Sequence, residues 1–410
     1  MSNFKRQKAI MSTIDWNVEH MRDRITANTG NTTTPSNIFI DSPISSCGGM
    51  VVGADGHVYM IPYNDKYVAK IHSDNNEIVH NSTYTYSDGT VYDGTMQVGA
   101  YTSDTETRVD VNTDSSKYWG GVLAENGYIY CIPYCANYVL KIDTNYGSET
   151  YGKLSKIEFE ITKEGVGGNY SYNYWKGGVL APNGIIYCAP CNSSYILKID
   201  TRTDTVGYMN DEFVSGLLGV SYNFCSGAVL TPYGKIIFVP YGATRIPILN
   251  VADENMSWIT YDMGSTSNRW AAGLYDSVRD RVMFIPNEKS LDVMELKYYA
   301  SGRFDVTTNP YYTPVSVNFG NGALATNGHV YLLPKSTDAQ CYQLSSTSAG
   351  PNSSFGATDS DLQNWHAILA PNGKIYSAGY GSKIMIISPN STGNLNFGLS
   401  TILSPYLNKF

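Results

Sequence analysis

A short sequence phrase recurs seven times along the 410 residues of this chain, and this repetition restricts the possible folds more than any other feature. Two copies, GGVLAENGYIYCIPY at 120–134 and GGVLAPNGIIYCAPC at 177–191, are nearly identical. Each copy contains one turn residue, and these anchors are Gly56, Gly127, Gly184, Gly234, Asp280, Gly328 and Gly373. Consecutive anchors lie 45 to 71 residues apart, which indicates a structural unit that is built seven times.

Each copy has the pattern of a β-hairpin. A short apolar segment leads into Asn-Gly or Asp-Gly, the dipeptides that supply the positive φ angles of a tight turn. β-branched and aromatic residues follow and favour a strand, and a proline, which lacks an N–H donor, suits the end of that strand. The prolines stand six residues after the anchors, at Pro62, Pro133, Pro190, Pro240, Pro286 and Pro334, whereas the last copy has Gly379. A third segment such as YVLKIDT at 138–144 and a less regular fourth segment complete a four-stranded antiparallel meander.

Four-stranded meanders repeated seven times predict an all-β fold, a seven-bladed β-propeller whose blades pack radially around a central channel. A β-sandwich would not repeat its sequence at this period, and a β-helix has much shorter rungs. Small residues open each copy, so we expect the innermost strands to be crowded near the axis. We interpret a bulky residue beside them as a wedge between neighbouring blades. The expected wedges are Trp119, Trp175, Trp270, Phe319 and Trp365, with Cys47 and Cys225 in the two other copies.

The chain divides into an N-terminal segment, 1–36, and the propeller, 37–410. Apolar residues spaced by three and four positions predict one face of a helix within the first segment. This face consists of Met11, Ile14, Val18, Met21 and Ile25. A ring of blades has no structural need for such a helix, so we expect its apolar face to bind a partner by docking or oligomerisation. Packing on its own propeller is the alternative. Residues 37–41 are a candidate for the strand that closes the last blade, and residues 394–403 compete for that place.

Composition restricts the partners. Charged residues make up only 16% of the chain and the formal net charge is −8, which argues against binding the phosphate backbone of nucleic acid. The N-terminus lacks the apolar core of a signal peptide, and no stretch approaches 18 consecutive apolar residues. We therefore expect neither membrane insertion nor secretion by a signal peptide. The 34 tyrosines serve strand formation and also suit the binding of proteins or glycans.

Four cysteines, Cys131, Cys135, Cys188 and Cys191, have spacings that resemble metal-binding pairs. However, Cys131 and Cys188 occupy a strand position that is apolar in other copies. There the position holds Met60, Phe238, Phe284 and Leu332. A buried free cysteine behaves as a small apolar residue, so we predict that these cysteines bind no metal. Catalytic and cofactor motifs are absent from the sequence, and we predict neither an enzyme nor a cofactor.

The repeat W-x-G-G-V-L-A-P-N-G-x-I-Y-x-x-P-Y followed by V-L-K-I-D-T resembles a propeller repeat of tailed bacteriophages and other large DNA viruses, with relatives in some protists. The resemblance covers about residues 47–387 and is strongest in the third copy. It implies a virion-associated protein of the neck, tail or capsid surface, present in multiple copies and assembled in the host cytoplasm. Its implied partners are other virion proteins and a glycan or protein of the host surface, and it transfers no catalytic residue.

These observations together predict a non-enzymatic structural or interaction protein of a phage virion, which docks or attaches to a host through its N-terminal segment or a blade face. One alternative is an enzyme at the channel mouth, such as a glycan lyase or hydrolase. A glycan-binding lectin, with exposed tyrosines beside Asn and Asp, is the other. A cluster of carboxylates or histidines at one mouth of the channel would favour the enzyme. A channel lined by the small residues of the repeat would favour the interaction protein.

Overall fold

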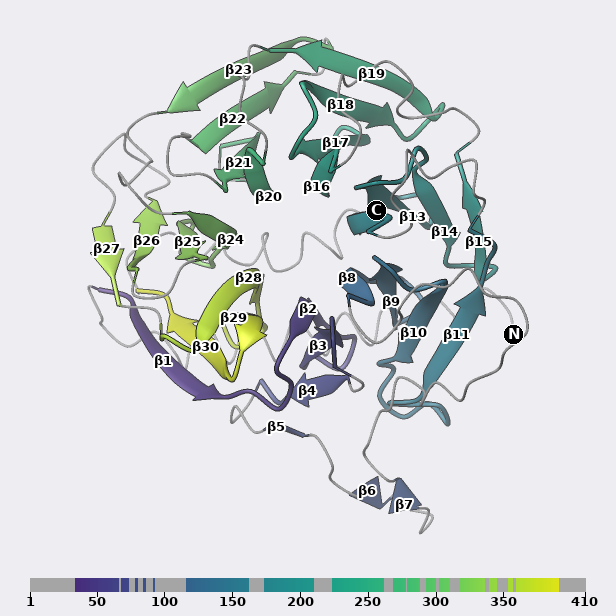
Figure 1. Ribbon diagram of the computed structural model, residues 1–410, viewed down its shortest axis with the longest axis vertical. Coiled ribbons are helices and arrows are strands. Elements are labelled where there is room, and N and C mark those ends of the chain that lie inside the picture. The colour runs from purple at the N-terminus through teal and green to yellow at the C-terminus, as the bar shows by residue number, and fades with distance from the viewer. Residues whose placement is uncertain are drawn as a thin grey trace.

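The computed structural model shows a ring of seven four-stranded antiparallel sheets around a central axis (Figure 1), so the predicted seven-bladed propeller is confirmed. It describes residues 34–65, 68–73, 78–79, 84–85, 91–92, 116–161, 173–209, 223–261, 268–277, 279–287, 293–299, 302–309, 318–335, 339–344, 353–356 and 359–390. These residues contain no helix. The helix predicted within residues 1–36 lies outside them.

We number the blades I to VII along the chain, and in blades I to VI the strands run in chain order from the innermost outwards. Blade I contains β2 (Cys47–Val52), β3 (Val58–Pro62), β4 (Ala69–Ile71) and β5 (Ile78–Val79). Blade II contains β8 (Tyr118–Leu123), β9 (Tyr128–Pro133), β10 (Tyr138–Asp143) and β11 (Leu154–Glu158). Blade III contains β12 (Trp175–Leu180), β13 (Ile185–Pro190), β14 (Leu197–Asp200) and β15 (Thr205–Tyr208).

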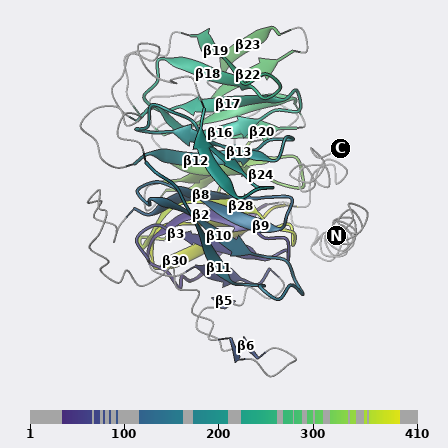
Figure 2. The ribbon, with the colours of Figure 1, turned by 90° about the vertical axis from the view of Figure 1, so that its right-hand side faces the viewer.

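The next three blades repeat this arrangement. Blade IV contains β16 (Cys225–Leu230), β17 (Lys235–Pro240), β18 (Arg245–Asn250) and β19 (Asn255–Thr260). Blade V contains β20 (Trp270–Asp276), β21 (Arg281–Pro286), β22 (Val293–Tyr298) and β23 (Phe304–Asn309). Blade VI contains β24 (Phe319–Leu324), β25 (Val330–Pro334), β26 (Cys341–Leu344) and β27 (Ser353–Phe355). A small hairpin of β6 (Tyr84–Thr85) and β7 (Val91–Tyr92) lies outside the ring, beyond β5 (Figures 1 and 2).

Blade VII closes the ring with strands from both ends of the described chain. It contains β28 (Leu362–Leu369), β29 (Ile375–Gly381) and β30 (Lys383–Ser388), and its outermost strand is β1 (Ser36–Asp41). Antiparallel pairing runs from Ser36 opposite Ser388 to Asp41 opposite Lys383, and the Lys383 ammonium lies 2.6 Å from the Asp41 carboxylate. The candidate closing strand at 37–41 is confirmed, while residues 394–403 lie outside the described part of the chain.

The seven anchors adopt the predicted turn conformation. All have φ between 52° and 79°, the left-handed region that glycine enters without steric cost. Asp280 has the lowest value and is the only anchor that is not glycine. Its carboxylate accepts hydrogen bonds from the hydroxyls of Tyr233 and Tyr275, and these contacts help to hold a strained backbone. The copy that departs from the repeat therefore still forms the same hairpin.

The proline also acts as expected. In blades I to VI it is the last residue of the second strand, and it pairs with the first residue of the innermost strand. In blade VII, where Gly379 replaces it, pairing of β28 with β29 continues two residues further, to Leu362 opposite Gly381. The proline, which lacks an N–H donor, thus ends the pairing of the second strand with the innermost strand. Where glycine replaces it, this pairing is longer.

Neighbouring blades are joined by a repeated hydrogen-bond cluster, which we call the interblade clasp. Between blades II and III, Asn126 donates to the Tyr130 hydroxyl at 2.8 Å, and that hydroxyl donates to Asp204 at 2.6 Å. Lys141 also binds Asp204, at 2.5 Å. The clasp of blades III and IV consists of Asn183, Tyr187, Lys198 and Glu254. The asparagine of the turn and the tyrosine four residues later thus connect blades as well as building the hairpin.

The hydrophobic core is divided among the interfaces between blades. Opposite each proline or its substitute stands a buried residue of the innermost strand, and five of the expected wedges occupy this place. These are Cys47, Trp175, Cys225, Trp270 and Phe319, each at most 3% exposed. Each packs in a cluster with strands of the preceding blade. The expectation for Trp119 and Trp365 was wrong, because Tyr118 and Asn364 hold this position in blades II and VII.

Candidate functional site

A β-bulge lies at the same point of all seven innermost strands. It follows the residue opposite the proline, so two residues of the inner strand stand against one of its partner. In blade II the bulge follows Tyr118, and in blade VII it follows Asn364. The next residues, Trp119 and Trp365, therefore leave the blade interface and line the axial cavity instead.

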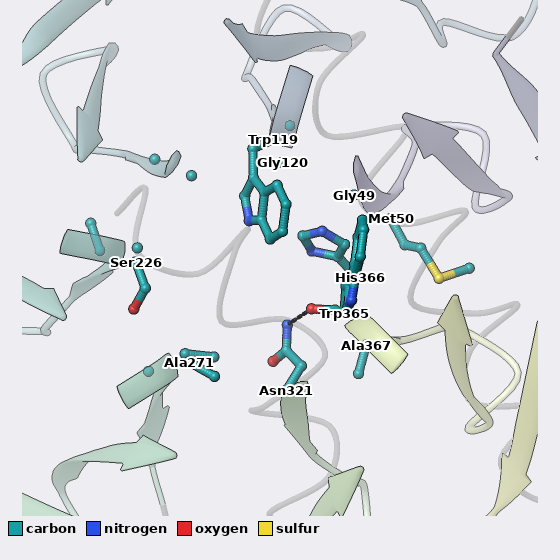
Figure 3. A pocket seen from close by; sticks show the side chains of 17 residues that line it. Gly49, Met50, Trp119, Gly120, Ser226, Ala271, Asn321, Trp365, His366 and Ala367 are labelled. Carbon is teal, nitrogen blue, oxygen red and sulfur yellow. Dashed lines mark hydrogen bonds between the residues drawn. The ribbon is translucent and has the colours of Figure 1, made fainter. Parts of the chain in front are cut away.

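This axial cavity has a volume of about 190 Å³. Of its 17 lining residues, 11 are glycine or alanine and none is a carboxylate. The lining is uneven: Figure 3 shows the rings of Trp119, Trp365 and His366 together on one side, with Ser226 and Ala271 across the cavity. Blades IV and V thus contribute small side chains, whereas blades II and VII contribute large ones that can contact a ligand.

The large side chains continue into an aromatic cluster at the end of the channel where the prolines stand. The rings of Trp119 and Trp365 are stacked, with centroids 5.4 Å apart and planes 23° apart. Tyr63 meets each of them edge-on at 5.5 Å. Tyr134 lies 5.4 Å from Trp119, and Tyr380 lies 6.0 Å from Trp365 and is 53% exposed. We call this end of the channel, with these five residues, the aromatic mouth.

His366 is a buried titratable group in this cavity. Its ring lies 5.1 Å from Trp119 in an edge-to-face arrangement, and its side chain is 9% exposed. Burial, together with the nearby charge of Lys176, lowers the pKa of His366 to about 3, so the imidazole is neutral near pH 7. Among the described residues, neither its Nε2 atom nor the Nε1 atom of Trp365 has a hydrogen-bond partner. Two buried polar atoms at the aromatic mouth are therefore unsatisfied within the described part of the chain, which is uncommon in native proteins.

Lys176 occupies in blade III the place that Trp119 has in blade II. Its Nζ atom lies 4.4 Å from the centroid of the Trp119 ring and 4.7 Å from that of Tyr241. Burial lowers the pKa of Lys176 to about 8; Cys191 raises this pKa and Lys335 lowers it further. The residue after Pro334, Lys335, is half-buried, and burial lowers its pKa too. The described residues offer neither lysine a carboxylate partner.

The four paired cysteines have different environments. Cys131 and Cys188 lie in the second strands of their blades and are fully buried, as the alignment of the copies predicted. Cys135 and Cys191 lie near the aromatic mouth in a cluster with Tyr134, and burial raises the pKa of each thiol to about 11. Within the described residues, no group of three or more His, Cys, Asp or Glu side chains could hold a metal ion.

Sequence reasoning did not identify the aromatic mouth. Trp119 and Trp365 were assigned to blade interfaces, and Lys176 and His366 were given no role. The sequence signal that could have identified the two tryptophans is their departure from the repeat. At their position most other copies have glycine, serine or alanine. The predicted partner-binding residues, by contrast, lie outside the described residues. They are Met11, Ile14, Val18, Met21 and Ile25.

Comparison with known proteins identifies the architecture. No family model matches the chain, and no curated protein matches its sequence. Among solved structures, a catalytically inactive histidine-to-alanine variant of virginiamycin B lyase from Staphylococcus aureus, with quinupristin, is similar with a TM-score of 0.61 and 12% identity. The similarity covers 86% of this chain and 99% of that chain.

Two further structures have unrelated names. The extracellular domain of a putative hybrid two-component system from B. thetaiotaomicron has a TM-score of 0.55 and 12% identity, over 86% of this chain and 39% of that chain. The WD40 repeats of RRP9 have a TM-score of 0.55 and 8% identity, over 86% of this chain and 97% of that chain. These similarities show the propeller fold, which hosts many functions. In the described part of the chain, no helix has the length and apolar composition needed to cross a membrane.

Proposed function

We propose that this protein is a non-enzymatic interaction module that binds its ligand at the aromatic mouth. One observation carries the proposal: most of the residues that line the channel are small residues of the repeat, and its largest side chains are the stacked pair Trp119 and Trp365, beside His366. Aromatic faces give a large contact area at low entropic cost, and the two unpartnered polar atoms supply orientation.

The binding proposal is tested by tryptophan fluorescence and calorimetry with monocyclic probes, here methyl glucoside and benzyl alcohol. We expect at least one probe to bind, and we expect Trp119→Ala to abolish this binding because it removes half of the stacked pair. Trp258→Phe, on the outermost strand of blade IV, is the matched control and should leave the affinity unchanged. Binding that survives Trp119→Ala would overturn the proposal, as would failure of these probes and of their carboxylate analogues alike.

The enzymatic alternative has its own test. In the similar lyase structure, a histidine-to-alanine substitution accompanies the loss of catalysis, which makes His366 the residue to change here. We expect a probe that binds to be recovered chemically unchanged after prolonged incubation. Turnover that is lost in His366→Ala would instead establish a reaction at the channel mouth.

We further propose a virion location, as a neck, tail or capsid-surface component. Its support is the resemblance of the repeat to phage and viral propellers. Mass spectrometry of purified particles should find several copies of the protein per particle. Recovery in the lysate of infected cells, with none in the particles, would refute this location.

Partner contact through residues 1–30 is proposed separately. β1, the outermost strand of blade VII, begins at Ser36 and is the first described strand of the chain. Deletion of residues 1–30 therefore leaves every described strand in place. We expect the truncated protein to keep its melting temperature and to lose assembly or attachment, because the stripe of Met11, Ile14, Val18, Met21 and Ile25 is removed. A large fall in melting temperature with assembly retained would show that the segment supports the propeller instead.

A further inference from the structure

We infer that the aromatic mouth selects a ligand in which a single ring carries a carboxylate, and that Lys176 and Lys335 attract this group. The inference deepens the proposed function and rests on it. An acidic sugar and an aromatic acid share this chemistry. Both combine a ring face for the tryptophans with a negative charge for the lysines.

Lys176 and Lys335 are two cations without a carboxylate partner among the described residues. Lys176 and Lys335 are both half-buried, and the charge of Lys335 lowers the pKa of Lys176. Neither makes an ion pair with a described carboxylate. Like charges that are partly removed from water are unfavourable together unless an anion joins them. The uncompensated pair therefore favours an anionic ligand.

Two other cations at this end of the channel, Lys117 and Arg269, are hydrogen-bonded to backbone carbonyls. The Lys117 ammonium donates to the carbonyls of Asn64 and Asp65, and the Arg269 guanidinium donates to the carbonyls of Gly242 and Ala243. Backbone carbonyls thus hold these two side chains in structural contacts. The Asp65 carboxylate accepts from the backbone N–H of Ser46 at 2.8 Å and stays at the edge of blade I. The Lys176 ammonium lies over the rings of Trp119 and Tyr241 and makes no ion pair with a carboxylate of the described residues.

The size of the cavity supports a single ring. A dry cavity of roughly 150 Å³ in another protein accommodates benzene, and the axial cavity here measures about 190 Å³. A ring substituent would supply the partner that the Nε1–H of Trp365 and the Nε2 atom of His366 lack among the described residues. The side chains of Trp365 and His366 lie on the aromatic side of the cavity in Figure 3.

Binding of a carboxylate should depend on pH in a defined direction. A nearby anion favours the charged form of Lys176, so it raises the pKa of this lysine from about 8, and affinity falls as the pH rises beyond that value. Cys191, His366, Lys335 and the Tyr241 ring face the same amine. Since the pKa of His366 is about 3 and that of Cys191 about 11, neither changes charge between pH 6.5 and 9.5.

The experiment compares each acid with a neutral counterpart by calorimetry: glucuronate with methyl glucoside, and benzoate with benzyl alcohol. At pH 6.5 we expect one acid to bind about tenfold tighter than its counterpart, the ratio that one charge-assisted contact provides. At pH 9.5 this preference should fall to about threefold or less. The acid that binds identifies the source of the ring, sugar or aromatic.

Substitutions of Lys176 distinguish the contribution of its charge to binding from the contribution of the cavity. Lys176→Met should remove the preference for the acid while binding of the neutral ring persists. Lys176→Arg should keep the preference at pH 9.5, because a guanidinium stays charged there. Lys374→Met, beside the hairpin turn of blade VII, is the control and should change nothing. Equal binding of acid and neutral ring at pH 6.5 would overturn the inference and leave the proposed function standing. Failure of all four probes would overturn both.

Discussion

The two ends of the propeller hairpins differ in how closely they follow the repeat. At one end, which we call the hairpin end, seven turn residues share one backbone conformation, and clasps of asparagine, tyrosine and acid recur between blades. At the aromatic mouth the corresponding positions of the blades hold tryptophan, lysine, serine, alanine or glycine. Repetition therefore encodes the scaffold, and the exceptions to it encode the site.

Blades II and III show the same contrast within nearly identical sequences. Their clasps match, with Tyr130 and Tyr187 each hydrogen-bonded to an acidic residue of the next blade. At the aromatic mouth, however, blade II presents Trp119 and blade III presents Lys176, and the lysine lies over the indole ring. Blades II and III thus form matching clasps at the hairpin end but contribute different side chains to the aromatic mouth.

The largest expected effect comes from a glycine near the axis. A Cβ atom on Gly320 would stand 1.6 Å from the carbonyl oxygen of Asn364 in the next blade, whereas one on Gly227 would meet no atom within 4 Å. We expect Gly320→Ala to lower the free energy of unfolding by about 3 kcal/mol and Gly227→Ala to change it by less than about 0.5 kcal/mol. Urea unfolding measures both. Equal stabilities would show that the inner strands are not in close contact at Gly320.

The next-largest expected effect on stability distinguishes Tyr187 at the hairpin end from Tyr380 at the aromatic mouth. Tyr187→Phe removes the hydroxyl that accepts from Asn183 and donates to Glu254 at 2.7 Å. The free energy of unfolding should fall by roughly 1–2 kcal/mol, because two half-buried partners lose a hydrogen bond. Tyr380→Phe, at an exposed ring of the mouth, should have almost no effect on urea unfolding. If the two variants were equally destabilised, the clasp would have no special role.

The pH dependence of stability tests the buried histidine. Its pKa is about 3 in the folded state and about 6.5 when unfolded, so the unfolded chain binds more protons between these values. The contribution of His366 to stability is therefore complete above pH 6.5 and is lost as the pH falls towards 3. We expect His366→Gln to lose less stability than the natural protein between pH 7.5 and 4.5 in thermal unfolding. Parallel pH profiles would contradict the burial of a neutral imidazole.

The smallest expected effect compares two lysines of blade III. Lys198 at the hairpin end binds Glu254 at 2.6 Å, so Lys198→Met should lower the free energy of unfolding by about 0.5–1 kcal/mol. Lys176→Met at the mouth removes a cation that has no carboxylate partner among the described residues, so stability should be unchanged or slightly raised. Differential scanning calorimetry at pH 7 compares the two variants. A loss of stability in Lys176→Met that equals the loss in Lys198→Met would indicate a counter-charge at the mouth.

Local features of the sequence predicted most of the scaffold. The anchors revealed the number of blades because Asn-Gly and Asp-Gly turns depend on backbone conformation within a few residues. Asp280 also adopts the left-handed backbone conformation of the glycine anchors. The prolines marked strand ends for an equally local reason, since the missing donor belongs to the residue itself. The closing strand at 37–41 was one of two candidates, and its choice needed the pairing of β1 with β30.

The site depended on tertiary structure. The sequence by itself determined seven hairpins, their turns and the ends of their second strands, because each of these follows from a few neighbouring residues. Whether Tyr118 or Trp119 entered the blade interface was decided by a bulge, which exchanges the sides of consecutive residues. Only closure of the ring then brought Trp119, Lys176 and Trp365 of three blades together. Contacts across blades join residues far apart in sequence, so no local pattern specifies them.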